Sequence, residues 1–123
     1  MKRTAIKRKP GKMAAADKAF SLFIRERDGR CMAGGTDDLV CSGRLQCCHL
    51  VSRRYRALRW SEQGAIALCQ AHHMFFTHHP LEWMGWVTRY TPTGLTWDEL
   101  SYLALNDPPE RADEALARLR GAA

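Results

Sequence analysis

The chain has 123 residues, the length of one compact domain, and its 46% hydrophobic and 26% charged residues are the balance of an ordinary folded protein. No apolar run approaches the roughly 20 residues that span a bilayer, and Lys12, Asp17 and Lys18 interrupt the apolar stretch nearest the N-terminus. We therefore expect neither a membrane span nor a secretory signal, and a cytoplasmic location.

Positive charge is concentrated at the N-terminus. The net charge is +6, and residues 1–12 hold six of the 19 basic residues and no acidic one. The remainder carries 13 basic and 13 acidic residues and is neutral. A basic segment before a neutral domain fits a polyanionic partner, most often nucleic acid; a solubilising tail is the alternative. We expect residues 1–12 to form a flexible basic arm in which Lys7, Arg8 and Lys9 contact nucleic acid.

The first regular element is expected to be a helix from Ala14 to Asp28. Ala16, Phe20 and Ile24 recur at helical spacing, and Gly29 is a typical C-terminal stop. The elements that follow are a cysteine-containing loop over 30–44, a strand over 45–51, a basic segment over 52–64, a short strand over 65–68 and a helix over 70–78.

The C-terminal third is predicted to be helical. Aromatic and aliphatic residues from Leu81 to Tyr90 indicate a buried helix. Thr96 and Glu99 have the spacing of a capping box for a helix ending near residue 105. Residues 110–120 form a last amphipathic helix. Four tryptophans are expected mainly in the core, with base stacking as the alternative: Trp60, Trp83, Trp86 and Trp97.

Cysteine and histidine spacing predicts a metal site. Five cysteines without an export signal argue against disulfides. Four candidate ligands lie in two clusters, namely Cys31 with Cys41 and Cys69 with His72. Zinc favours such a set of four nitrogen or sulfur ligands. Cys47 and Cys48 are competing ligands, and a buried, unligated thiol is the alternative for Cys47.

A second pattern spans the two predicted strands and the helix after them. Cys48-His49 ends the first strand, with fourteen residues between His49 and Gly64 and eight between Gly64 and His73. This arrangement resembles the ββα-metal motif of HNH endonucleases. The segments FSLFIRERDGRC, CSGRLQCCHLVSRRY, ALRW and THHPLEW are also similar to small phage-encoded HNH nucleases of the NinG type, and the resemblance is specific over residues 20–86.

The resemblance implies the fold and the site. The fold is α+β, a small zinc-stabilised ββα-metal core with flanking helices over residues 13–105, followed by a C-terminal helix over 106–123. His49 corresponds to the general base and His73 to the ligand of a catalytic Mg²⁺, Mn²⁺ or Ni²⁺. The structural zinc includes His72. Cys48 and His78 are further candidate ligands of the catalytic ion.

Two positions depart from the family pattern. Gly64 occupies the place of an Asn that braces the loop and helps to orient the base, and Cys48 replaces the usual Asp or His. Arg53, Arg54 and Arg56 follow the base and are expected to contact DNA phosphates, or else to form a solvated basic turn. The resemblance therefore implies a phage or prophage DNA endonuclease, with a catalytically weakened, zinc-stabilised DNA-binding module as the alternative.

Overall fold

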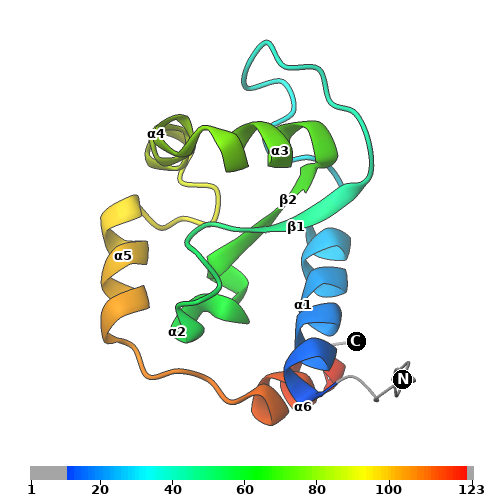
Figure 1. The fold of residues 1–123 in the computed structure, drawn as a ribbon, viewed down its shortest axis with the longest axis vertical. Helices are drawn as coiled ribbons and strands as arrows, with labels where there is room; N and C mark the ends of the chain where they lie inside the picture. The colour runs from blue at the N-terminus through cyan, green and yellow to red at the C-terminus, as the bar shows by residue number, and fades with distance from the viewer. Residues whose placement is uncertain (1–10, 122–123) are drawn as a thin grey trace, which may run out of the picture.

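Helices surround one small β-sheet, so the fold is α+β, as the sequence predicts (Figure 1). The computed structural model describes residues 11–121. The elements in chain order are α1 (Lys12–Asp28), β1 (Leu45–His49), α2 (Arg56–Arg59), the 3₁₀ helix η1 (Glu62–Gly64), β2 (Ala65–Cys69), α3 (Gln70–His78), α4 (Pro80–Tyr90), α5 (Trp97–Asn106) and α6 (Ala112–Gly121).

The start of α1 shortens the predicted arm. Lys12 is the first residue of α1, and Gly11 is its N-cap with an extended backbone. The predicted arm over residues 1–12 is therefore too long by at least one residue, because Lys12 is helical. Residues 1–10, which include Lys7, Arg8 and Lys9, lie outside the described residues. At the other end, Gly29 caps α1 in the left-handed conformation, with φ of 66°.

β1 ends two residues earlier than predicted. The N–H of Leu50 still donates to the carbonyl of Gly64 at 2.8 Å, but the Leu50 carbonyl accepts from Trp83 Nε1 at 2.8 Å. This side-chain partner turns the chain out of the sheet after His49. The basic segment that follows then forms a turn, α2 and η1.

The two strands form an antiparallel hairpin whose two faces are both covered (Figure 1). Leu45 lies opposite Cys69 and His49 lies opposite Ala65. Along β2 the side chains alternate between two core clusters. Ala65 and Ala67 face α1, whereas their larger neighbours pack on the α3 side. Every residue of β2 is buried, so the hairpin is the centre of the fold.

Helices α1 and α6 form the first of these layers. Phe20 and Ile24 of α1 pack with Trp60, and Ala115 and Leu119 of α6 complete the cluster. Figure 1 shows α6 lying at the N-terminal end of α1. The C-terminal helix, which the sequence predicted as a separate segment, therefore belongs to the core of the domain.

Helices α3, α4 and α5 form the second layer. Phe76 of α3 contacts Trp83 and Trp86 of α4, with ring centroids 5.0 and 5.7 Å apart. The predicted capping box of α5 is confirmed, since both its Thr96 and Glu99 hydrogen bonds are 3.1 Å. The predicted burial is confirmed for Trp60, Trp83 and Trp86, while Trp97 is half-buried.

Within residues 11–121, none of the helices combines the length and the apolar character needed to cross a membrane.

Candidate metal centre and catalytic site

Four side chains meet as the sequence predicted for the metal site. Their ligand atoms all lie within 4.8 Å of one another, and we call the group the Cys3His cluster: Cys31, Cys41, Cys69 and His72. Cys31 and Cys41 come from the loop after α1, whereas Cys69 ends β2 and His72 lies in the first turn of α3. His72 is fully buried and Cys41 is exposed. The cluster is positioned to hold a metal ion.

The geometry of the cluster fits a tetrahedral zinc. His72 Nδ1 lies 3.6 Å from Cys31 Sγ, 3.6 Å from Cys41 Sγ and 3.2 Å from Cys69 Sγ. Zinc bonds of about 2.3 Å to sulfur and 2.0–2.1 Å to nitrogen place S and N roughly 3.5 Å apart in a tetrahedron. Three cysteines and one histidine are also a typical structural zinc set. The spacing and the donor types therefore both suit zinc.

Asp37 orients the histidine ligand, a role that the sequence did not reveal. His72 Nε2 lies 2.9 Å from Asp37 Oδ1. When His72 Nε2–H donates to this carboxylate, Nδ1 keeps its lone pair and faces the three sulfurs. Such a carboxylate behind a histidine raises the basicity of the ligand. Burial lowers the pKa of His72, but the hydrogen bonds and charges of Asp37 and Cys69 together outweigh it, so the net shift is upward.

Cys69 is a thiol prepared for ligation. It is the N-cap of α3, and its Sγ accepts a hydrogen bond from the N–H of His72 at 3.4 Å. Burial raises the pKa of Cys69, but this backbone hydrogen bond and the contact with the His72 ring outweigh it and hold the pKa at about 6. A thiol with this pKa is largely thiolate at neutral pH, the form that binds metal.

Backbone contacts hold the irregular cysteine loop against the hairpin. The N–H of Met32 donates to the Ala67 carbonyl at 2.9 Å, and the N–H of Ala71 donates to the Ser42 carbonyl at 3.1 Å. A Cβ on Gly34 would lie 3.0 Å from Cys41 Sγ. Glycine at position 34 therefore lets the chain pass close to the cluster, which is how ligands ten residues apart can converge.

His49 ends β1 with its ring held in one orientation. Its Nε2 lies 2.8 Å from the carbonyl of Arg59, and its ring packs on Phe20 with centroids 5.7 Å apart. A carbonyl only accepts hydrogen bonds, so Nε2 carries the proton and Nδ1 is left as a base. Burial, assisted by the charges of Arg53 and Arg59, lowers the pKa of His49. The ring is therefore neutral at pH 7 and able to take a proton.

An ion pair fixes the residue that holds His49. The Arg59 guanidinium makes two hydrogen bonds to Asp17 of α1, at 2.9 and 2.6 Å, and Trp60 Nε1 donates to the same carboxylate at 2.9 Å. Burial raises the pKa of Asp17, but these hydrogen bonds outweigh it and the net shift is downward. Asp17 thus anchors α2 to α1 and, through Arg59, positions His49.

Asp17→Asn is expected to lower the free energy of unfolding by about 1–3 kcal/mol, because it leaves the half-buried Arg59 without its ionic partner. The folded-state pKa of Asp17 is lowered, so its contribution is complete above about pH 4 and is lost as pH falls through that lowered value. Urea unfolding at pH 7 measures the effect, with the exposed Asp38→Asn as control. Equal midpoints for Asp17→Asn and the wild type would contradict this role.

Gly64, which the HNH resemblance places at the position of an Asn, is closely packed. It is buried, its N–H donates to the Ser61 carbonyl at 2.9 Å and its carbonyl accepts from Leu50. A Cβ here would lie 2.6 Å from the Leu58 carbonyl oxygen and 3.2 Å from Leu58 Cβ. Gly64 is not among the glycines with positive φ. Lack of space, rather than a left-handed backbone, therefore requires glycine at this position.

Gly64→Ala is expected to destabilise the protein by about 1–3 kcal/mol, the usual cost of overpacking. Gly85→Ala is the matched control, because a Cβ at this exposed position of α4 meets nothing within 4 Å; helix propensity there favours alanine by up to about 1 kcal/mol. Thermal unfolding of both variants tests the difference. If Gly64→Ala melts no lower than Gly85→Ala, the close contact with Leu58 does not constrain this position.

His73 lies on α3 beside β1. Its Nδ1 is 2.7 Å from Gln46 Oε1, an arrangement that orients the ring and leaves Nε2 available to a metal ion. His73 and His78 line the same shallow hollow of about 300 Å³, together with Thr77. Thr77 also lines the cavity that contains His49. Within residues 11–121, however, the Cys3His cluster is the one group of three or more ligands close enough to hold a metal.

Cys48 does not line the hollow with His73. It is buried in the core cluster on the α3 side of the hairpin, and its Sγ lies 3.8 Å from the carbonyl of His49. Burial raises its pKa to about 12, which disfavours the thiolate that a metal needs. Cys47 packs instead toward α1, and burial likewise raises its pKa to about 12. Both neighbouring thiols thus have core environments.

The three arginines that follow His49 in the chain are exposed. Arg53 lies 3.8 Å from Asp17 Oδ2 in a solvent-accessible ion pair. Arg54 and Arg56 lie over the rings of Tyr55 and Trp60, at 5.5 and 5.8 Å from the centroids. Their guanidinium groups remain accessible to an anion such as a phosphate.

No family model, curated protein sequence or solved structure matches this chain. Its function must therefore be inferred from its own residues, chiefly the Cys3His cluster, His49 and His73.

Proposed function

We propose that this protein is a metal-dependent HNH-type DNA endonuclease of phage or prophage origin. Its ββα-metal core is β1, β2 and α3, and a structural zinc occupies the Cys3His cluster. The order of these elements and the positions of His49 and His73 support the proposal. The bacterial cytoplasm supplies both the DNA and the reducing conditions that keep metal-binding thiols free.

The observation that carries the proposal is the hydrogen bond between His49 Nε2 and the Arg59 carbonyl, at 2.8 Å. A general base needs a free lone pair, a fixed orientation and a pKa near or below the working pH. The carbonyl supplies the orientation and leaves Nδ1 free, while burial lowers the pKa.

The reaction is hydrolysis of a phosphodiester bond. His49 Nδ1 takes a proton from water, the water oxygen bonds to phosphorus, and the bond from phosphorus to the 3′ oxygen breaks. The departing oxygen takes a proton from solvent. A divalent ion held by His73 would neutralise charge on the phosphate and the leaving oxygen. Arg53, Arg54 and Arg56 bind flanking phosphates and so fix the DNA backbone beside His49.

A zinc-stabilised DNA-binding module without hydrolysis is the second candidate. Gly64 favours it, because the family Asn is absent and the Leu58 carbonyl leaves no space for a side chain at this position. Loss of a group that positions the base lowers the rate, since a displacement of about 1 Å can cost ~10²-fold.

Incubation with supercoiled plasmid separates the two candidates. The purified protein is mixed with plasmid and Mg²⁺, Mn²⁺, Ni²⁺ or no added metal, and nicked and linear products are measured over time. The endonuclease is expected to nick slowly and only with added metal. A mobility shift without nicking under every metal condition would favour the binding module.

Deleting residues 1–9 is expected to weaken DNA binding without changing the melting temperature. The deletion removes five basic residues and leaves the N-cap of α1 intact. Each phosphate contact that is lost should flatten the dependence of log K on log salt by roughly 0.9 for duplex DNA. Fluorescence anisotropy at several salt concentrations measures the slope. An unchanged slope would mean that the segment does not contact DNA.

A further inference from the structure

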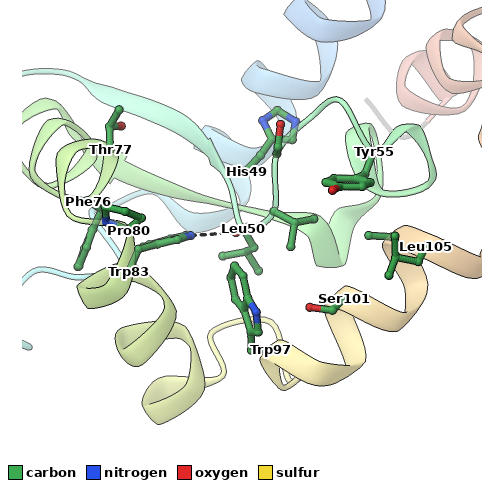
Figure 2. A pocket seen from close by; sticks show the side chains of 13 residues that line it. His49, Leu50, Tyr55, Phe76, Thr77, Pro80, Trp83, Trp97, Ser101 and Leu105 are labelled. Atoms are coloured by element: carbon green, nitrogen blue, oxygen red, sulfur yellow. Dashed lines mark hydrogen bonds between the residues drawn. The ribbon is translucent and has the colours of Figure 1, made fainter.

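A cavity of about 550 Å³ opens beside His49, between the end of β1, the α3–α4 junction and α5 (Figure 2). Its walls are mainly apolar and aromatic: Leu50, Tyr55, Phe76, Trp83, Trp97 and Leu105. The core packing does not fill this space. We propose that the cavity receives one unstacked nucleobase next to the scissile phosphate, so that the substrate is unpaired DNA; this rests on the proposed endonuclease function.

The aromatic walls are rigid enough to stack a base. Trp83 is fixed by the hydrogen bond from its Nε1 to the Leu50 carbonyl, at 2.8 Å, and by parallel stacking on Trp86, with an interplanar angle of 7°. Figure 2 shows Trp83 and Trp97 on adjoining sides of the cavity and Tyr55 across from them. Extruded or single-stranded bases are held by stacking on such side chains.

Polar groups that line the cavity can form hydrogen bonds with the polar edge of a base. Ser52 and Ser101 both line the cavity, and Figure 2 shows the Ser101 hydroxyl directed from α5 toward its interior. The Thr77 hydroxyl is already used, since it donates to the His73 carbonyl at 2.7 Å. Hydroxyls beside aromatic walls suit a ligand with apolar faces and a polar rim, which describes a nucleobase.

The charges beside the cavity distinguish a nucleotide from an apolar protein segment. Ser52 and Tyr55 line the cavity, and the two residues between them are the exposed Arg53 and Arg54. Arg54 also lies over the Tyr55 ring. A nucleotide uses both features, because its base enters the cavity while its phosphates meet the guanidinium groups. His49 lines the same cavity, so the phosphate next to the base comes close to the proposed general base.

The test compares two short DNA single strands of equal length, an oligothymidylate and an abasic strand with the same phosphates. Fluorescence anisotropy measures their affinity for the full-length protein without added divalent ion. The wild type is expected to bind oligothymidylate about 10- to 100-fold more tightly, as stacking of one base allows. Ala104→Trp fills the cavity and should remove this preference while retaining affinity for the abasic strand.

Two further variants locate the effect. Asn106→Trp adds the same side chain to an exposed position of α5 outside the cavity and should keep the preference. Trp97→Leu removes one aromatic wall but retains apolar packing, and should reduce the preference for the strand with bases. It provides the test if Ala104→Trp does not fold. Equal binding of both strands by the wild type, or an unchanged preference in Ala104→Trp and Trp97→Leu, would overturn the proposal and leave the cavity to another ligand, such as an apolar protein segment.

The plasmid-nicking assay, combined with the binding assay, shows which proposal fails: the endonuclease function or the base-binding cavity. A protein that nicks plasmid but does not prefer the strand with bases keeps the endonuclease function and loses the base-binding cavity. A protein that prefers bases through the cavity but never cleaves keeps the cavity and loses the hydrolytic function.

Discussion

Cys69→Ser is expected to lose the bound metal and most of the thermal stability of the protein. Structural zinc contributes on the order of 10 kcal/mol to the folding of small domains, which is comparable with the whole net stability of a typical domain. The Cys3His cluster joins the loop after α1 to the junction of β2 and α3. That loop has no regular secondary structure, so without the metal only a few hydrogen bonds, such as those of Met32 and Ser42, hold it against the hairpin and α3.

The measurement is zinc content by elemental analysis together with thermal unfolding by circular dichroism. Native protein should contain about one zinc per chain, and Cys69→Ser close to none. Cys47→Ser is the matched control, because Cys47 packs toward α1 and is not part of the cluster; it should keep its zinc. Native protein without zinc, or Cys69→Ser with full zinc and an unchanged melting temperature, would exclude a structural role for the metal.

Asp37→Asn tests the orientation of the ligand separately. It retains all four metal ligands but removes the carboxylate from His72 Nε2. Loss of such a partner typically lowers metal affinity by about 10- to 100-fold. A chelator competition should therefore place Asp37→Asn between the wild type and Cys69→Ser.

The helices were largely predictable because their signals are local. Gly29 ends α1, and Thr96 with Glu99 begins α5, as the sequence indicated. The early end of β1 was not predictable in this way. It depends on Trp83, which lies 33 residues further along the chain from Leu50 and takes its carbonyl. The packing of α6 on α1 is likewise a long-range contact that periodicity alone does not reveal.

For the Cys3His cluster, the candidate ligands could be predicted from the sequence, but the residues that position those ligands could not. Cysteine and histidine spacing identified the four side chains that meet in the cluster as candidate ligands, because few other roles suit free cysteines in such pairs. Asp37 looked like an ordinary loop residue, since nothing local shows that it faces His72. The glycine at position 34, three residues after Cys31, was a signal in the sequence that the backbone passes close to the cysteine side chains.

The environments of the two cysteines in β1 also depended on the tertiary structure. Alternation in a strand suggests that one of Cys47 and Cys48 is buried and the other accessible. Here α1 covers one face of the hairpin and α3 the other, so both thiols lie in core surroundings. The same packing removes Cys48 from the hollow that contains His73. The alternation rule assumes that one face of a sheet is buried, so it fails here because helices cover both faces of the hairpin.

His49→Ala is expected to reduce metal-dependent nicking by about 10²- to 10⁴-fold, the usual effect of losing a general base. Zinc content and DNA affinity should not change, because His49 is not part of the Cys3His cluster and the exposed arginines remain. His49→Gln is the closer variant. Its amide can donate to the Arg59 carbonyl in place of Nε2, but it provides no base at the position of Nδ1.

The pH dependence of nicking separates a base from a packing residue. Burial lowers the pKa of His49 below its ordinary value of 6.5. The neutral, active form therefore persists below pH 6.5, and the rate should fall as pH drops through the lowered pKa. The residual activity of His49→Gln should lack this fall, whereas His79→Ala, in which a surface histidine at the end of α3 is removed, should retain it. If His49→Gln cleaves at the wild-type rate, or shows the same acid limb, another group takes the proton from water.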